Sequence, residues 1–215
     1  MLSQFYKIVR KTLISFLCMV PPVANAGVFS GADVDGNGGR TWYLGAQTEE
    51  ILYYGLFVGQ NQYELTDKSY AQGYMAGGVG YRWYGAWTTN ILLGLENSRV
   101  NETGQARNQG QRFSGLYGQL ALMKFLGDKN IEFLLSFSEN SEQIWSRFRL
   151  KYYTSSGFLV GPELVASRFL AYEYQGLGLV VEKAISQYTI TTKIGVKNQN
   201  DSASSYGGVE IYRSF

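Results

Sequence analysis

Histidine is absent from the 215-residue chain, cysteine occurs once and proline three times. The absence of histidine excludes Ser-His-Asp triads, histidine general bases and histidine metal ligands. A single cysteine excludes a disulfide framework and cysteine-based zinc sites. No apolar run approaches the roughly 18 residues that a membrane-spanning helix needs. The chain has 19 Lys and Arg against 17 Asp and Glu, so it also lacks the strongly basic field expected for binding nucleic acid.

The N-terminal residues follow the order of regions found in a secretory signal peptide. Residues 1–12 carry three cations and no acidic residue, and the short apolar run 13–20 ends at two prolines. The segment 24–26, Ala-Asn-Ala, fits the small residues of a cleavage site. We therefore expect residues 1–26 to be a cleaved signal peptide and 27–215 to be one exported domain. Loss of the three cations leaves 16 of the 19 Lys and Arg against 17 Asp and Glu, a net charge of −1.

After residue 27, apolar residues recur at every second position, as in the row Leu52, Tyr54, Leu56 and Val58. This period indicates strands that have one apolar face. Segments rich in Gly, Asn, Asp and Ser predict the turns between them. The expected strands are 28–35, 40–48, 51–65, 70–83, 87–98, 111–125, 130–138, 143–153, 158–169, 172–183, 187–197 and 205–215.

About twelve such strands fit an all-β, antiparallel, up-and-down outer-membrane β-barrel. An even strand number, an export signal and Tyr and Trp near strand ends are typical of these barrels. The tail 209–215 is similar to the terminal strand of outer-membrane proteins and ends in Phe215. The polar segments 99–110 and 198–204 predict longer connections at one end of the barrel. The alternative is a soluble β-sandwich with the apolar rows turned toward an inner core.

If the apolar rows face lipid, the alternate rows face the lumen. The inward residues of the strands 143–153 and 158–169 are then Trp145, Arg147, Arg149, Lys151, Gly161, Glu163, Val165 and Ser167. Other inward charges are expected at Arg82, Glu96, Glu132, Lys193, Lys197 and Glu210. Inward tyrosines are expected at Tyr43, Tyr74, Tyr117, Tyr172, Tyr174, Tyr206 and Tyr212.

Glu163 is expected opposite Arg147 or Arg149 across the hairpin between these two strands. Pro162 lacks a backbone N–H and predicts a local irregularity that re-aims Glu163. Two interpretations of the inward residues stay open. In one, charges of both signs pair and brace a narrow barrel. In the other, the aromatic and charged lumen contacts sugar.

No catalytic signature is present, and we expect neither an enzyme nor a cofactor. Acyl-transfer chemistry of the kind found in small barrels usually needs a histidine. A glycosidase needs two carboxylates about 5–9.5 Å apart, but no spacing singles out a pair among Glu96, Glu132 and Glu163. Asp33 and Asp35 resemble the start of a Ca²⁺ loop, but the downstream acid is missing, which favours a hairpin turn and no metal.

Several patches resemble the BcsS family of cellulose biosynthesis proteins, which are exported β-rich proteins associated with bacterial cellulose production. The strongest patch is Ile144–Leu150 (IWSRFRL), followed by Gly161–Leu164 (GPEL) and then by Tyr172. The family shows a similar aromatic-Ser-Arg-apolar-Arg strand, a Gly-Pro-Glu strand and a downstream Tyr. The segment 76–83 (AGGVGYRW) and the tail 206–215 are similar to the family as well.

The resemblance implies a non-catalytic accessory role in cellulose biosynthesis or export at the bacterial outer membrane. Expected partners are outer-membrane lipid, cellulose or another glucan, and components of cellulose secretion, with no nucleic acid. Two alternatives stay open: a general small-solute outer-membrane channel, and a soluble periplasmic β-sandwich that binds glucan. The candidate lumen and glucan-binding residues are Trp145, Arg147, Arg149, Gly161, Pro162, Glu163, Tyr172 and Tyr174.

Overall fold

The computed structural model describes most of the chain after the predicted signal peptide. The described residues are 26–64, 69–102, 110–139, 142–169, 172–199 and 202–214. The predicted signal peptide lies outside them except for its last residue, and so does Phe215. Within the described ranges, no helix is long and apolar enough to cross a membrane.

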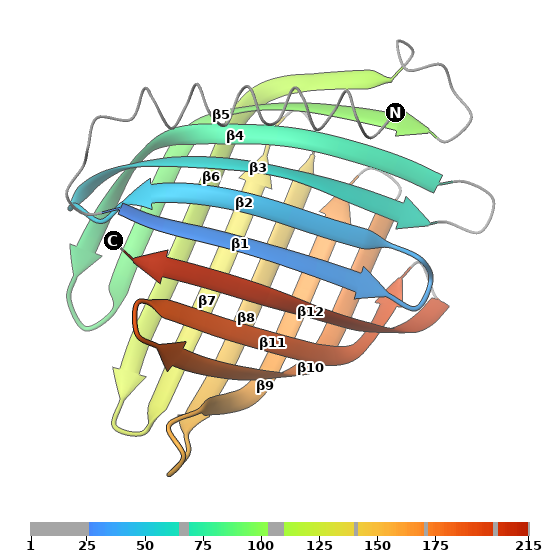
Figure 1. The fold of residues 1–215 in the computed structure, drawn as a ribbon. Coiled ribbons are helices and arrows are strands. Elements are labelled where there is room, and N and C mark those ends of the chain that lie inside the picture. Colours follow the sequence, from blue (N-terminus) through green and yellow to red (C-terminus); the bar gives the residue numbers. More distant parts are fainter. Residues whose placement is uncertain are drawn as a thin grey trace.

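The described residues form twelve antiparallel strands that close into a barrel (Figure 1). The strands are β1 (Ala26–Asp35), β2 (Arg40–Thr48), β3 (Leu52–Glu64), β4 (Ser69–Tyr84), β5 (Thr88–Glu102), β6 (Gln111–Leu126), β7 (Lys129–Ser138), β8 (Gln143–Tyr153), β9 (Leu159–Phe169), β10 (Tyr172–Ile185), β11 (Tyr188–Gln199) and β12 (Ser202–Ser214). Each strand pairs with its neighbours in sequence, and β1 closes the ring by pairing with β12. The predicted up-and-down barrel is confirmed, and the β-sandwich alternative is wrong.

The barrel reverses the distribution of polar and apolar residues found in water-soluble domains. Large apolar side chains cover the outside, and Leu95 and Ile194 are each 68% exposed. Charged side chains lie inside, where Lys151 and Glu163 are both 0% exposed. A water-soluble monomer rarely exposes such a large apolar surface. The outside therefore faces lipid, and the apolar rows seen in the sequence lie on it.

Aromatic and polar residues mark the two edges of this apolar belt. One edge lies at the terminal end, where β1 begins and β12 finishes. The exposed tyrosines and tryptophans there include Tyr81, Trp83, Tyr84, Trp87, Tyr152, Tyr153 and Tyr188. Tyr and Trp favour the membrane–water interface. Toward the opposite end, the far end, the belt on β5 stops between Leu95 and Asn97, whose Nδ2 donates to Ser114 Oγ at 2.8 Å on the exposed surface.

Two predicted polar connections are shorter than the sequence indicates. β11 continues to Gln199 and β12 begins at Ser202, so most of the predicted loop 198–204 is strand. β5 continues to Glu102, well into the predicted loop 99–110. Backbone pairing does not require an apolar face, so strands continue beyond the lipid as polar hairpins. Hydropathy alone therefore marks the edge of the belt and misses the ends of the strands.

Pro162 interrupts one strand ladder without inserting a residue. On the β8 side, Arg149 pairs with Glu163 and the pairing resumes at Tyr152 and Val160 in the same register. On the β10 side the register is unbroken. The predicted irregularity is present, since proline has no N–H to donate. However, it is not a bulge and it does not re-aim Glu163, which points inward by ordinary alternation.

Candidate functional site in the barrel lumen

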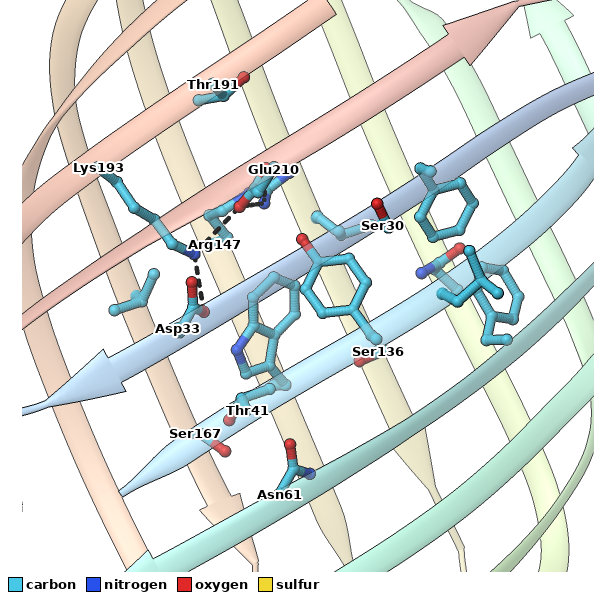
Figure 2. A pocket seen from close by; sticks show the side chains of 18 of the residues that line it. Ser30, Asp33, Thr41, Asn61, Ser136, Arg147, Ser167, Thr191, Lys193 and Glu210 are labelled. Atoms are coloured by element: carbon cyan, nitrogen blue, oxygen red, sulfur yellow. Dashed lines mark hydrogen bonds and ion pairs between the residues drawn. The ribbon is translucent and has the colours of Figure 1, made fainter. Parts of the chain in front are cut away.

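The barrel encloses a cavity of about 620 Å³. Its lining includes Arg40, the first residue of β2, and Gln47 near the other end of that strand. It also includes Thr189 and Lys197, which lie near opposite ends of β11. The cavity therefore follows most of the length of the barrel, and polar side chains from several strands surround it (Figure 2).

Glu210 on β12 is the centre of an ion-pair network on one side of the cavity. Its carboxylate lies 2.9 Å from Arg147, 2.8 Å from Arg149 and 3.0 Å from Lys193. Lys193 also pairs with Asp33 on β1 at 2.9 Å, and Figure 2 shows these side chains converging. Strands that are distant in sequence are thereby joined through their side chains.

Arg149 and Glu163 form the most buried pair of this network. Arg149 Nη2 lies 2.5 Å from Glu163 Oε2, and the side chains are 2% and 0% exposed. The Tyr206 hydroxyl donates to Glu163 Oε1 at 3.2 Å, so both carboxylate oxygens have partners. Of the two predicted partners, Arg149 is the one opposite Glu163, while Arg147 stands opposite Val165. A buried ion needs such partners, so this pair braces β8 against β9 and β12.

Two lysines complete the charged wall, the part of the lumen formed by β7–β12 and β1. Lys151 lies 2.6 Å from Glu132 and 2.7 Å from Glu182, and Lys197 pairs with Asp35 at 2.5 Å. The residues of the charged wall are Asp33, Asp35, Glu132, Arg147, Arg149, Lys151, Glu163, Glu182, Lys193, Lys197 and Glu210. Every cation of this wall has a carboxylate partner, so the wall presents fixed polar groups with no surplus of positive charge.

The opposite part of the lumen, the aromatic wall, is formed by β2–β6 with Phe29 of β1 and is rich in aromatic rings. The Phe57 ring centroid lies 5.5 Å from that of Phe29 and 6.0 Å from that of Tyr117. Tyr43 and Tyr74 line the cavity on the same side. These rings give the cavity flat apolar surfaces facing the charged wall.

Buried side chains narrow the lumen toward the terminal end. Tyr53 and Leu92 are 2% and 0% exposed. The Arg82 guanidinium lies 5.3 Å from the Tyr53 ring centroid and donates to Asn90 Oδ1 and to the Glu49 carbonyl oxygen. The cavity therefore continues at this level beside these side chains, lined by residues of the charged wall and by Gln47, Gln119 and Met123.

Four of the eight candidate residues line the cavity: Trp145, Arg147, Arg149 and Tyr174. Trp145 Nε1 donates to the Tyr174 hydroxyl at 3.2 Å. The Arg147 guanidinium lies 5.6 Å from the Trp145 ring centroid. These residues make one continuous patch from β8 to β10, as alternation predicts.

The other four candidates lie elsewhere. Pro162 is exposed on the lipid face, and Glu163 is covered by its partners. Gly161 lies against β8, where a Cβ would stand 2.8 Å from the carbonyl carbon of Leu150. None of these three is among the described residues that line the cavity. The backbone of Tyr172 begins β10, and its side chain lies outside the described part.

Alternation predicts which residues point into the lumen, but it does not predict which of them contact one another. Alternation places Lys193 and Glu210 inward but does not say that they meet each other and Asp33. Phe57 also points into the lumen. Its neighbours Leu56 and Val58 form an outward row, so the same alternation would have predicted its direction.

The turn predicted after Asp35 is present. Asp35 Oδ1 accepts hydrogen bonds from the backbone N–H groups of Asn37 at 2.9 Å and Gly39 at 3.0 Å. Its other carboxylate oxygen pairs with Lys197. The carboxylate thus fixes the hairpin and the charged wall together.

No family model and no curated protein matches the chain. Solved structures of similar fold include the KdgM porin, at 8% identity and a TM-score of 0.53, covering 88% of this chain and 99% of that one. The KdgM porin in complex with disordered oligogalacturonate is similar at 7% identity, with the same TM-score and coverage. A deltaS2 mutant of the TodX monoaromatic hydrocarbon channel is similar at 10% identity and a TM-score of 0.50, covering 88% of each chain. The chain has the fold of bacterial outer-membrane barrels, and its lipid-facing belt agrees with the predicted outer-membrane location.

Proposed function

We propose that the barrel is a non-catalytic channel for small polar solutes across the outer membrane. The observation that carries this proposal is the cavity of about 620 Å³, lined from Arg40 at the far end to Gln47 near the terminal end. A barrel that served only as an anchor would fill its interior with side chains. The likeness of the fold to porin and channel structures supports the same proposal.

The two walls offer complementary contacts to a passing solute. Ion pairs hold Arg147 and Lys193 in place, so these side chains do not swing across the path. A polar solute exchanges water for hydrogen bonds on the charged wall while its apolar faces lie against the aromatic wall. Different residues therefore stabilise the wall and contact the solute. Glu163 stabilises the charged wall, and Arg147 faces the cavity through which the solute passes.

Filling the cavity with one bulky side chain tests the channel. Ser136 lines the cavity from β7 (Figure 2), and the adjacent Leu135 points outward, so tryptophan at each position puts the same bulk on opposite faces. We expect Ser136→Trp to lower single-channel conductance in planar bilayers and the rate at which proteoliposomes swell in arabinose. Leu135→Trp should leave both at the wild-type level. A wild-type barrel without conductance, or equal conductance in the two variants, would overturn the proposal.

The resemblance to the cellulose biosynthesis family supports a second proposal, an accessory role in cellulose production. The observation that favours it is the Trp145–Tyr174 patch, because aromatic faces beside hydrogen-bonding groups suit sugar rings. The partners would be cellulose or another glucan and components of cellulose secretion. Conductance separates the two proposals, since a plugged accessory barrel does not conduct and its deletion lowers cellulose output.

A further inference from the structure

Glu96 is a carboxylate of the lumen that stands outside the charged wall. It points inward from β5, is 6% exposed and lines the cavity. In the part of the chain that the structure describes, it makes no ion pair, and its Oε1 has no hydrogen-bond partner. The hydroxyls of Ser98 and Ser138 lie within hydrogen-bonding reach of the carboxyl group and satisfy it only in part. A buried carboxylate without a cation is costly, which points to a ligand that brings the positive charge.

Small residues flank Glu96, and aromatic rings stand beyond them. Ala76 on β4 and Gly115 on β6 are directly opposite Glu96. Phe57 continues this inward row on β3, opposite Ala76, and its ring reaches that of Tyr117. The space beside the carboxylate is therefore bounded by aromatic faces and not by another ionic side chain.

The cations of the charged wall and Arg82 are engaged by other groups, and Arg40 lies farther along the sheet, level with Asn101 and not with Glu96. The charged wall holds five cations and six carboxylates, and each cation is already paired. Arg82, on the same side of the barrel, is engaged by Asn90, Tyr53 and the Glu49 carbonyl. The carboxyl group of Glu96 is thus available to a solute that brings a positive charge.

We propose that Glu96, with the rings of Phe57, Tyr74 and Tyr117, binds the ammonium group of an organic cation that has a small apolar body. The ammonium supplies the charge and the donor that Glu96 Oε1 lacks. Ring faces attract a cation, and the apolar body lies against the aromatic wall. The inference rests on the proposed channel only for the route by which the solute reaches the site.

Benzylamine, a cation at neutral pH, and benzyl alcohol, its uncharged counterpart of similar size, test the site by calorimetric titration of the folded full-length barrel. We expect Glu96→Gln to weaken benzylamine binding by about tenfold or more, through loss of a charged hydrogen-bond partner, and to leave benzyl alcohol binding unchanged. Glu50→Gln, in the exposed β2–β3 turn, is the matched control and should bind as the wild type. Tyr117→Leu keeps the carboxylate and should weaken binding of both probes.

Equal wild-type affinity for the two probes, or unchanged benzylamine affinity in folded Glu96→Gln, would overturn the proposal. A mobility shift on boiling shows whether each variant has folded, and Tyr117→Leu gives a second test of the site. Planar-bilayer conductance separates this proposal from the channel. Benzylamine binding to a barrel that does not conduct would refute the channel and keep the site. Conduction without preference for benzylamine would refute the site and keep the channel.

Discussion

At the residue scale, the Arg149–Glu163 pair is the part of the lumen most sensitive to a single change. Both side chains are almost fully buried, so removal of one leaves the other without its closest partner. We expect Glu163→Ala to lower the free energy of unfolding by about 3–5 kcal/mol. Urea unfolding followed by tryptophan fluorescence measures the loss, and Glu50→Ala on the exposed turn is the control.

Replacing both members of the pair tests whether their role is to stabilise the barrel. Arg149→Met combined with Glu163→Leu should recover most of the stability lost in Glu163→Ala, because two apolar side chains need no ionic partner. Glu210 keeps Arg147 and Lys193 in this double variant. A double variant no more stable than Glu163→Ala would contradict the bracing role.

At the scale of the strand, β5 gives a sharp test of the apolar belt. Leu93 points outward between Ile91 and Leu95 and is 63% exposed, while Asn97 lies on the same face beyond the belt. We expect Leu93→Arg to cost about 2–4 kcal/mol, because it places a charge in lipid, and Asn97→Arg to cost about 0–1 kcal/mol. Folding titrations in lipid vesicles measure both. Equal costs at the two positions would mean that the belt does not end between them.

The strands were largely predictable because the membrane imposes period two on every one of them. The expected bounds of 40–48 and 143–153 are those of β2 and β8. Prediction failed where the membrane no longer selects for apolar residues. In the predicted loop 198–204, the described residues 198–199 and 202–204 pair as strand. Prediction failed also at Pro162, because a missing N–H removes hydrogen bonds but does not require an inserted residue.

At the scale of the whole molecule, the sequence predicted which residues of the candidate site face the lumen, but not which of them form ion pairs. Alternation placed Arg147 and Glu210 inward, but they are 63 residues apart, and their contact depends on how the ring closes. Asp35 and Lys197 meet across 162 residues for the same reason. The pairing of Arg149 with Glu163 joins neighbouring strands of one hairpin. The register of a single hairpin determines it, so the sequence could predict it.

Closure of the ring also determines how the whole barrel unfolds. In the described part of the chain every strand has two paired neighbours, so the sheet has no edge from which to open. We expect the folded protein to resist SDS at room temperature, to stay in the outer-membrane fraction and to change its mobility on a gel after boiling. A chain that ends at residue 201 lacks β12 and with it Glu210, the shared partner of Arg147 and Lys193, and leaves β1 and β11 without the strand that joins them.

This truncated chain should run at one position with and without boiling, because the sheet then has two open edges and the charged wall has lost its central carboxylate. A full-length chain that shows no shift and appears in the soluble fraction would contradict the lipid-facing belt. A truncated chain that still shifts would show that the remaining strands hold the fold without closure, and the charged wall would then contribute less to stability than its burial indicates.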